Sequence, residues 1–186
     1  GRTIGPRRCS TRAPLPSEDT KADDIGMSLS VTKLHPLFAA RVEGIDIARG
    51  FSDTDFAELR AAFEEHSVIV LPGQTLDDGQ QIAFSERFGP LEMMLPHASN
   101  NMNPSHISRM YNSETDGAII PPEDRRMIYL KANRIWHTDS SFKETPSLCS
   151  LLYAYEVPPE GGETEFASMR AAYDALDAET KAQIEG

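Results

Sequence analysis

The sequence predicts an α+β protein with helices early in the chain and strands mainly later. The chain has 186 residues, of which 39% are hydrophobic, enough for one domain with a sizeable core. Helical spacing of apolar residues dominates positions 52–88, whereas short apolar or β-branched runs follow. Strands and helices do not alternate regularly. This order favours a largely antiparallel sheet over a doubly wound parallel one.

The first half of the chain contains clear helix start signals. Ser52 or Asp53 can cap a helix, in which Phe56, Leu59 and Phe63 recur at helical spacing. Before and after it, alternating or β-branched residues are typical of strands. In order, we expect a strand at 42–47, a helix from 52 to 63, a short buried strand at 68–71 and a helix from 75 to 88.

The second half is predicted to hold strands separated by long loops. Residues 93–104 and 112–126 are polar or irregular, and loops of this length usually carry function. Further on, we expect strands at 106–111, 127–130, 147–157 and 164–166, then helices at 169–176 and from 177 to the end.

Composition narrows the class of protein. Lys and Arg total 18 against 29 for Asp and Glu, giving a net charge of −11, so nucleic acid is not an expected partner. The longest apolar stretch, Leu148–Ala154, is too short to span a bilayer. Only Cys9 and Cys149 are present, which argues against a disulfide framework. We therefore expect a cytoplasmic protein in a reducing compartment.

The first 26 residues differ from the rest. They are polar, contain Arg7, Arg8, Pro14 and Pro16, and show no periodicity. We predict that residues 1–26 are a disordered or non-native tail and that the domain occupies 27–186. An organellar transit peptide is the alternative, although the acidic residues between 18 and 24 disfavour it.

One pair of residues suggests metal chemistry. His137 and Asp139 are two positions apart, so on a strand their side chains would share one face. An imidazole and a carboxylate on one face can hold one cation, and a further histidine would complete a 2-His-1-carboxylate facial triad for iron(II). The alternative is a histidine hydrogen-bonded to a nearby carboxylate. The spacing alone does not distinguish these readings.

The surrounding motifs favour the metal site. Residues 133–142 (Asn-Arg-Ile-Trp-His-Thr-Asp-Ser-Ser-Phe) resemble the metal-binding segment of the TauD/TfdA family of Fe(II)/2-oxoglutarate-dependent dioxygenases. Residues 157–166 and 169–176 are similar to the motif and helix that follow in the family, especially in its dichlorophenoxyacetate and phenoxyalkanoate branch. Matches upstream, at 43–46, 66–72 and 84–91, extend the resemblance over residues 31–186. It implies a double-stranded β-helix (jelly-roll) core with flanking helices, incomplete at the C-terminus.

The resemblance also implies roles for individual residues. His137 and Asp139 would be iron ligands, and the hydroxyl of Thr164 would bind a carboxylate of 2-oxoglutarate. Asn133 would lie on the substrate side. The alternatives are a strand threonine in a cross-strand pair for Thr164 and a loop-capping residue for Asn133. The family's second histidine ligand and its 2-oxoglutarate-binding arginine would lie beyond residue 186, so we expect an N-terminal fragment that is inactive alone and forms a homo-oligomer when full length.

The expected reaction uses iron(II), 2-oxoglutarate and O2 to hydroxylate a small organic acid, with release of succinate and CO2. After Leu91 the chain has Met93-Met94-Leu95, where taurine enzymes present polar residues, which favours a phenoxyalkanoate-like substrate over taurine. A taurine or alkylsulfonate dioxygenase remains the alternative, as does an inactive, truncated jelly-roll protein. A non-catalytic binding barrel would need neither Asp139 nor Thr164. A zinc hydrolase would need a different ligand motif, which is absent here.

Overall fold

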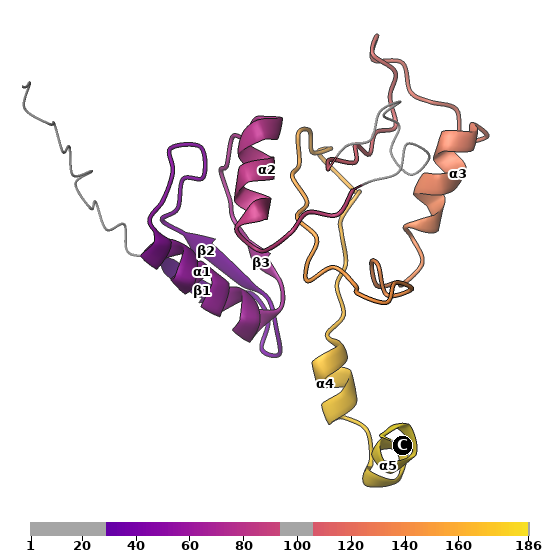
Figure 1. Ribbon diagram of the computed structural model, residues 1–186. Coiled ribbons are helices and arrows are strands. Elements are labelled where there is room, and N and C mark those ends of the chain that lie inside the picture. Colours follow the sequence, from indigo (N-terminus) through magenta and orange to yellow (C-terminus); the bar gives the residue numbers. More distant parts are fainter. Residues whose placement is uncertain (1–28, 94–105, 186) are drawn as a thin grey trace, which may run out of the picture.

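The structure is a computed structural model that describes residues 29–93 and 106–185 (Figure 1). The tail at 1–26, together with Met94, Leu95 and His97, lies outside the described residues. The elements in chain order are β1 (Ser30–Lys33), β2 (Ala40–Glu43), α1 (Asp53–His66), β3 (Ile69–Val70), α2 (Asp78–Glu86), α3 (Arg125–Ala132), α4 (Met169–Asp174) and α5 (Ala178–Ile184).

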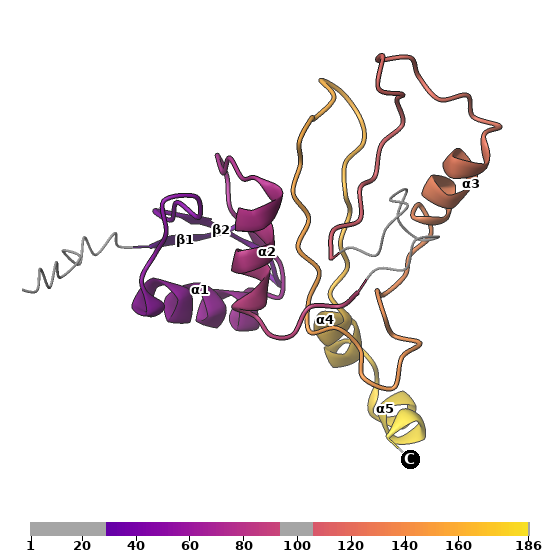
Figure 2. The same cartoon turned by 45° about the horizontal axis from the view of Figure 1, so that its top comes forward.

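The described sheet has three strands in the order β1-β2-β3 and is mixed. β1 pairs with β2 in antiparallel register, with Ser30 opposite Glu43, and β2 pairs with β3 in parallel, with Ala40 opposite Ile69. Helices α1 and α2 lie beside this sheet in both views (Figures 1 and 2). A sheet accompanied by separate helices confirms the α+β class, although the sheet is mixed where a largely antiparallel one was predicted.

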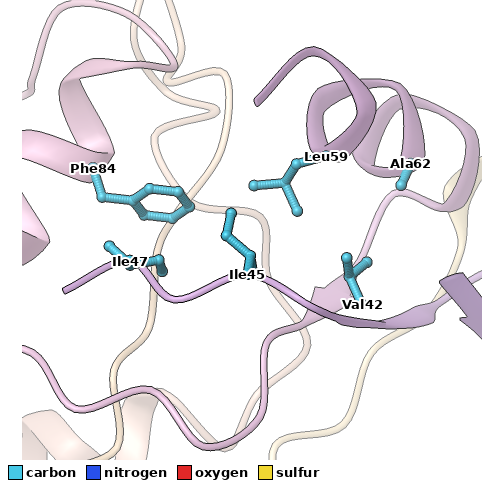
Figure 3. Close-up of a cluster of buried hydrophobic side chains, with 6 residues drawn as sticks. All are labelled: Val42, Ile45, Ile47, Leu59, Ala62 and Phe84. Carbon is cyan, nitrogen blue, oxygen red and sulfur yellow. The ribbon is translucent and has the colours of Figure 1, made fainter. Parts of the chain in front are cut away.

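The hydrophobic core joins the sheet to the first two helices. Its buried side chains alternate along β2 and the turn after it, and they meet apolar residues of α1 and α2 (Figure 3). The cluster consists of Val42, Ile45, Ile47, Leu59, Ala62 and Phe84. Residues 29–88 therefore form a packed unit against which later segments can lie.

Helix α1 begins with a reciprocal cap. The Ser52 hydroxyl accepts a hydrogen bond from the Asp55 amide at 3.1 Å, and the Asp55 carboxylate accepts from the Ser52 amide at 3.0 Å. Two amides at the helix start are thereby satisfied. The same arrangement of Asp77 and Gln80 begins α2. Helix α1 therefore starts where the sequence predicts, and α2 starts three residues after the predicted position 75.

Removing the cap of α1 gives the first testable prediction. Ser52→Ala leaves the Asp55 amide without its acceptor, and we expect the free energy of unfolding to fall by about 1 kcal/mol. Urea denaturation followed by circular dichroism measures the change. Ser52→Asn, which can still cap, is the matched control and should retain most of the stability. An equal loss in both variants would contradict the capping role.

Four predicted strands are not formed among the described residues. Residues 127–130 lie inside α3, because Asp124 caps a helix there by accepting from the Arg126 amide at 2.8 Å. A run of four apolar residues is too short for the spacing of its hydrophobic positions to show whether it forms a strand or a helix. Residues 106–111, 147–157 and 164–166 contain no strand. A strand needs a neighbouring strand in a hydrogen-bonded sheet, and the sheet of the described residues consists of β1, β2 and β3.

The segment at 147–157 lies against the N-terminal unit through alternate side chains. Leu151 packs on the core cluster, and the Tyr153 hydroxyl accepts a hydrogen bond from the Leu76 amide at 3.1 Å. Ser150 and Leu152, which alternate with these two residues along the chain, are exposed. This alternation places Ser150 on the side away from the core, where it meets the candidate site.

Within residues 29–93 and 106–185, no helix is long and apolar enough to cross a membrane.

Candidate metal centre

His137 and Asp139 come together just after α3. The Nε2 atom of His137 lies 3.3 Å from Oδ1 of Asp139, and the two side chains are 50% and 60% exposed. Neither residue is in a strand, so their approach comes from the turn that begins at Asp139. The two side chains thus lie close together, but the strand on which they were predicted to share a face is not formed.

A hydrogen bond to the backbone determines which ring nitrogen of His137 carries the hydrogen. Nδ1 of His137 lies 2.7 Å from the carbonyl oxygen of Ile135. A carbonyl oxygen only accepts, so Nδ1 carries the hydrogen in this contact. In the neutral ring, Nε2 then presents its lone pair to the Asp139 oxygen. A metal ion placed between these two atoms could accept a lone pair from each.

The second oxygen of Asp139 is already occupied. Ser150 donates its hydroxyl hydrogen to Oδ2 at 2.7 Å. Oδ1 is thus the oxygen that faces His137, and the carboxylate is held by a hydrogen bond on its other side. A supporting hydrogen bond of this kind commonly orients a carboxylate that binds a metal.

The pair fits two neighbouring positions of an octahedral divalent ion. Ligand atoms at roughly 2.1 Å from a metal lie about 3 Å apart when they occupy adjacent positions. The observed 3.3 Å is close to this separation. Nitrogen and oxygen donors together suit iron(II). No group of three metal-binding side chains occurs in the part of the chain that the structure describes, so the pair could offer two ligand atoms at most.

The other predicted site residues lie apart from the pair. Thr164 is exposed in an irregular segment, and no hydrogen bond joins it to His137 or Asp139. Asn133 caps the C-terminal end of α3, and its Nδ2 lies 3.5 Å from Sδ of Met110. The structure thus brings together two of the four predicted site residues.

The three other described histidines make different contacts. His35 accepts from the Leu37 amide at 3.2 Å in the loop after β1. His66 is buried in the last turn of α1, with Nε2 3.6 Å from Glu65. Nδ1 of His106 lies 3.1 Å from the backbone carbonyl of Glu92. None of the three joins His137 and Asp139 in a metal-binding group.

Sequence reasoning missed Glu92, which makes the densest set of polar contacts near the pair. Its Oε2 accepts from the hydroxyls of Ser140 at 2.9 Å and Ser147 at 2.5 Å. Its Oε1 forms an ion pair with Lys143. The hydrogen bonds from Lys143, Ser147 and Ser140 lower the pKa of Glu92 to about 2. Four serines within thirteen residues of His137 were the available signal, but sequence alone gives no partner for them.

The whole described domain matches a known family. The family model described as "Taurine catabolism dioxygenase TauD, TfdA family" matches residues 30–186. This match covers most of the chain, and the chain therefore belongs to the TauD/TfdA family. The resemblance in the motifs at 133–142 and 157–166 led to the same assignment.

Several relatives of the chain are named as dioxygenases of phenoxy acids. The chain is 40% identical over 163 residues to the alpha-ketoglutarate-dependent 2,4-dichlorophenoxyacetate dioxygenase of Cupriavidus pinatubonensis, covering 86% of this chain and 57% of the relative. It is 39% identical to the (S)-phenoxypropionate/alpha-ketoglutarate-dioxygenase of Sphingobium herbicidovorans, covering 85% and 51%. The crystal structure of AAD-2 in complex with Mn(II) and N-oxalylglycine superposes with a TM-score of 0.72 at 37% identity, covering 86% and 54%. The chain therefore spans about half the length of these relatives.

Proposed function

We propose that this protein is an Fe(II)- and 2-oxoglutarate-dependent dioxygenase that hydroxylates a phenoxyalkanoate-like organic acid. The observation that carries the proposal is the 3.3 Å approach of His137 Nε2 to Asp139 Oδ1, because both atoms can donate a lone pair to one metal ion. Family membership supports the choice of iron(II) over a proton or another metal. Iron(II), when bound with 2-oxoglutarate and O2, supplies the oxidising power to hydroxylate a C–H bond.

The residues of this chain have separate tasks in that reaction. His137 and Asp139 hold the metal through one nitrogen and one oxygen. The Ile135 carbonyl keeps hydrogen on Nδ1 of His137, which leaves Nε2 free to bind. Ser150 holds the second oxygen of Asp139, so the carboxylate binds through a defined atom. Asn133, six residues before Asp139, is proposed to face the substrate.

The substrate class follows from the relatives. The 2,4-dichlorophenoxyacetate enzyme at 40% identity and the phenoxypropionate enzyme at 39% identity both take an aryl ether acid. Hydroxylation of the carbon between the ether oxygen and the carboxylate gives a hemiacetal, which breaks down to a phenol and a 2-oxo acid. The half-exposed Met93, on the segment after Leu91, is suited to an apolar ring.

We extend the proposal to the fold, cellular location and oligomeric state of the whole protein. We infer that the unpaired segments at 147–157 and 164–166 are strands of a jelly-roll core in the whole domain, which starts near residue 27. The protein is proposed to be cytoplasmic and homo-oligomeric. It binds no nucleic acid or membrane in this proposal.

Thr164 provides the second testable prediction. Its hydroxyl is proposed to donate to a carboxylate of 2-oxoglutarate, and a hydrogen bond to a charged group contributes about 1.5–3 kcal/mol. Thr164→Val should therefore raise the KM for 2-oxoglutarate by roughly 10–100-fold. Thr164→Ser keeps the hydroxyl and is the matched control. A Val variant with the KM of the Ser variant would remove Thr164 from the co-substrate site.

An assay that measures succinate together with the product of the second substrate tests the proposed function. The full-length protein is incubated with 2-oxoglutarate, oxygen and either 2,4-dichlorophenoxyacetate or taurine, with and without iron(II). We expect succinate and phenol in equal amounts from the aryl ether acid, and only when iron is present. Sulfite from taurine would favour the alkylsulfonate alternative. A protein that releases succinate from neither substrate would contradict the proposal.

A further inference from the structure

The turn after Asp139 is held in a backbone conformation that needs support. Ser140 has a φ of 55°, a left-handed value that residues other than glycine rarely adopt. Its carbonyl accepts from the Lys143 amide at 3.0 Å, closing a tight turn. Such a conformation persists where neighbouring contacts fix it. At Ser140 the fixing contact is the hydrogen bond from its hydroxyl to Glu92.

Glu92 holds the two ends of the loop 140–147, which directly follows Asp139 in the chain. Ser140 directly follows Asp139, whereas Ser147 lies three residues before Ser150, the hydroxyl donor to Asp139. Both serines donate to the same Glu92 oxygen, and Lys143 between them pairs with the other. One carboxylate therefore sets the distance between Asp139 and the residue that orients it.

We propose that Glu92 is a positioning residue for the metal centre, acting through the loop 140–147 to hold Asp139 and Ser150 together. This inference rests on the proposed function, because it assigns Glu92 a task only if His137 and Asp139 bind a metal. Glu92 itself makes no hydrogen bond to either ligand. Its effect is to keep Oδ1 of Asp139 directed at His137 while Oδ2 stays on Ser150.

Asp78 offers a matched control within the same chain. Its carboxylate also ties distant segments, accepting from Arg109 at 2.5 Å and from the Tyr155 hydroxyl at 2.8 Å. It makes no contact with the loop 140–147 among the interactions of the described residues. Removing Asp78 should thus loosen the structure without altering the metal centre.

The test is titration of the protein with Mn(II), followed by the electron paramagnetic resonance of the free ion. We expect Glu92→Ala to weaken Mn(II) binding roughly 10–100-fold, as loss of supporting contacts around a metal ligand does elsewhere. Glu92→Gln and Ser147→Ala, which remove fewer contacts, should weaken it less. Asp78→Ala should bind Mn(II) as tightly as the unmodified protein. Thermal unfolding of each variant shows whether it is folded.

A double variant of Glu92 and Ser150 distinguishes a positioning role of Glu92 from a general loss of stability. If Glu92 acts through Ser150 and Asp139, the double variant Glu92→Ala/Ser150→Ala loses less affinity than the product of the single losses. Glu92→Ala and Ser147→Ala with unchanged Mn(II) affinity would overturn the positioning role while leaving the proposed function intact. Failure of the unmodified protein to bind Mn(II) would overturn both.

Discussion

Replacing His137 by alanine should abolish the metal centre. The variant loses the Nε2 lone pair, one of the two ligands in the described pair, and leaves Asp139 without the atom 3.3 Å away. Because loss of a supporting contact alone weakens metal sites 10–100-fold, loss of a ligand should weaken iron(II) binding by at least about 100-fold. Succinate formation should fall to the level seen without iron.

The control for this variant is another histidine. His35 is exposed in the loop after β1 and its Nδ1 accepts from the Leu37 amide. His35→Ala should keep both metal binding and turnover. If both histidine variants lose activity equally, the effect is on folding and not on a metal ligand. If His137→Ala keeps iron-dependent turnover, His137 is not an iron ligand.

The largest effect on stability is expected at Leu59. Its side chain is 0% exposed, on the face of α1 that packs on the sheet and α2 (Figure 3). Leu59→Ala removes three side-chain carbons, Cγ and both methyl groups, and leaves a cavity inside the buried cluster. We expect the free energy of unfolding to fall by roughly 2–5 kcal/mol. Urea denaturation measures the loss.

The same substitution at an exposed leucine isolates the effect of burial. Leu37, in the loop after β1, is 68% exposed. Leu37→Ala should change the free energy of unfolding by less than about 0.5 kcal/mol, as surface substitutions generally do. A Leu59 variant no less stable than the Leu37 variant would mean that the cluster of β2, α1 and α2 is not the core of the folded protein.

The elements that the sequence predicts well are those encoded locally. Ser52 with Asp55, and Asp77 with Gln80, satisfy helix-start amides within three residues, so their positions can be recognised in a short window. Ser168 and Asp177 likewise cap α4 and α5. The strand predicted at 127–130 was wrong because Asp124, outside the apolar run, caps a helix.

The site could be predicted only in part, because its contacts are a mixture of local and distant ones. His137 and Asp139 are two residues apart, and their pairing follows from the motif. Ser150 is eleven residues from Asp139, and Glu92 is 48 residues from Ser140. Contacts over such separations depend on how the chain packs, which residue spacing does not encode.

The central claim is that His137 and Asp139 hold one metal ion through Nε2 and Oδ1. A crystal structure of the protein grown with Mn(II) and N-oxalylglycine, the pair present in the AAD-2 structure, tests it through the anomalous signal of manganese. We predict a single strong peak at roughly 2–2.3 Å from both atoms, with Ser150 still hydrogen-bonded to Asp139. A peak bound elsewhere, with His137 and Asp139 joined only to each other, would contradict the claim.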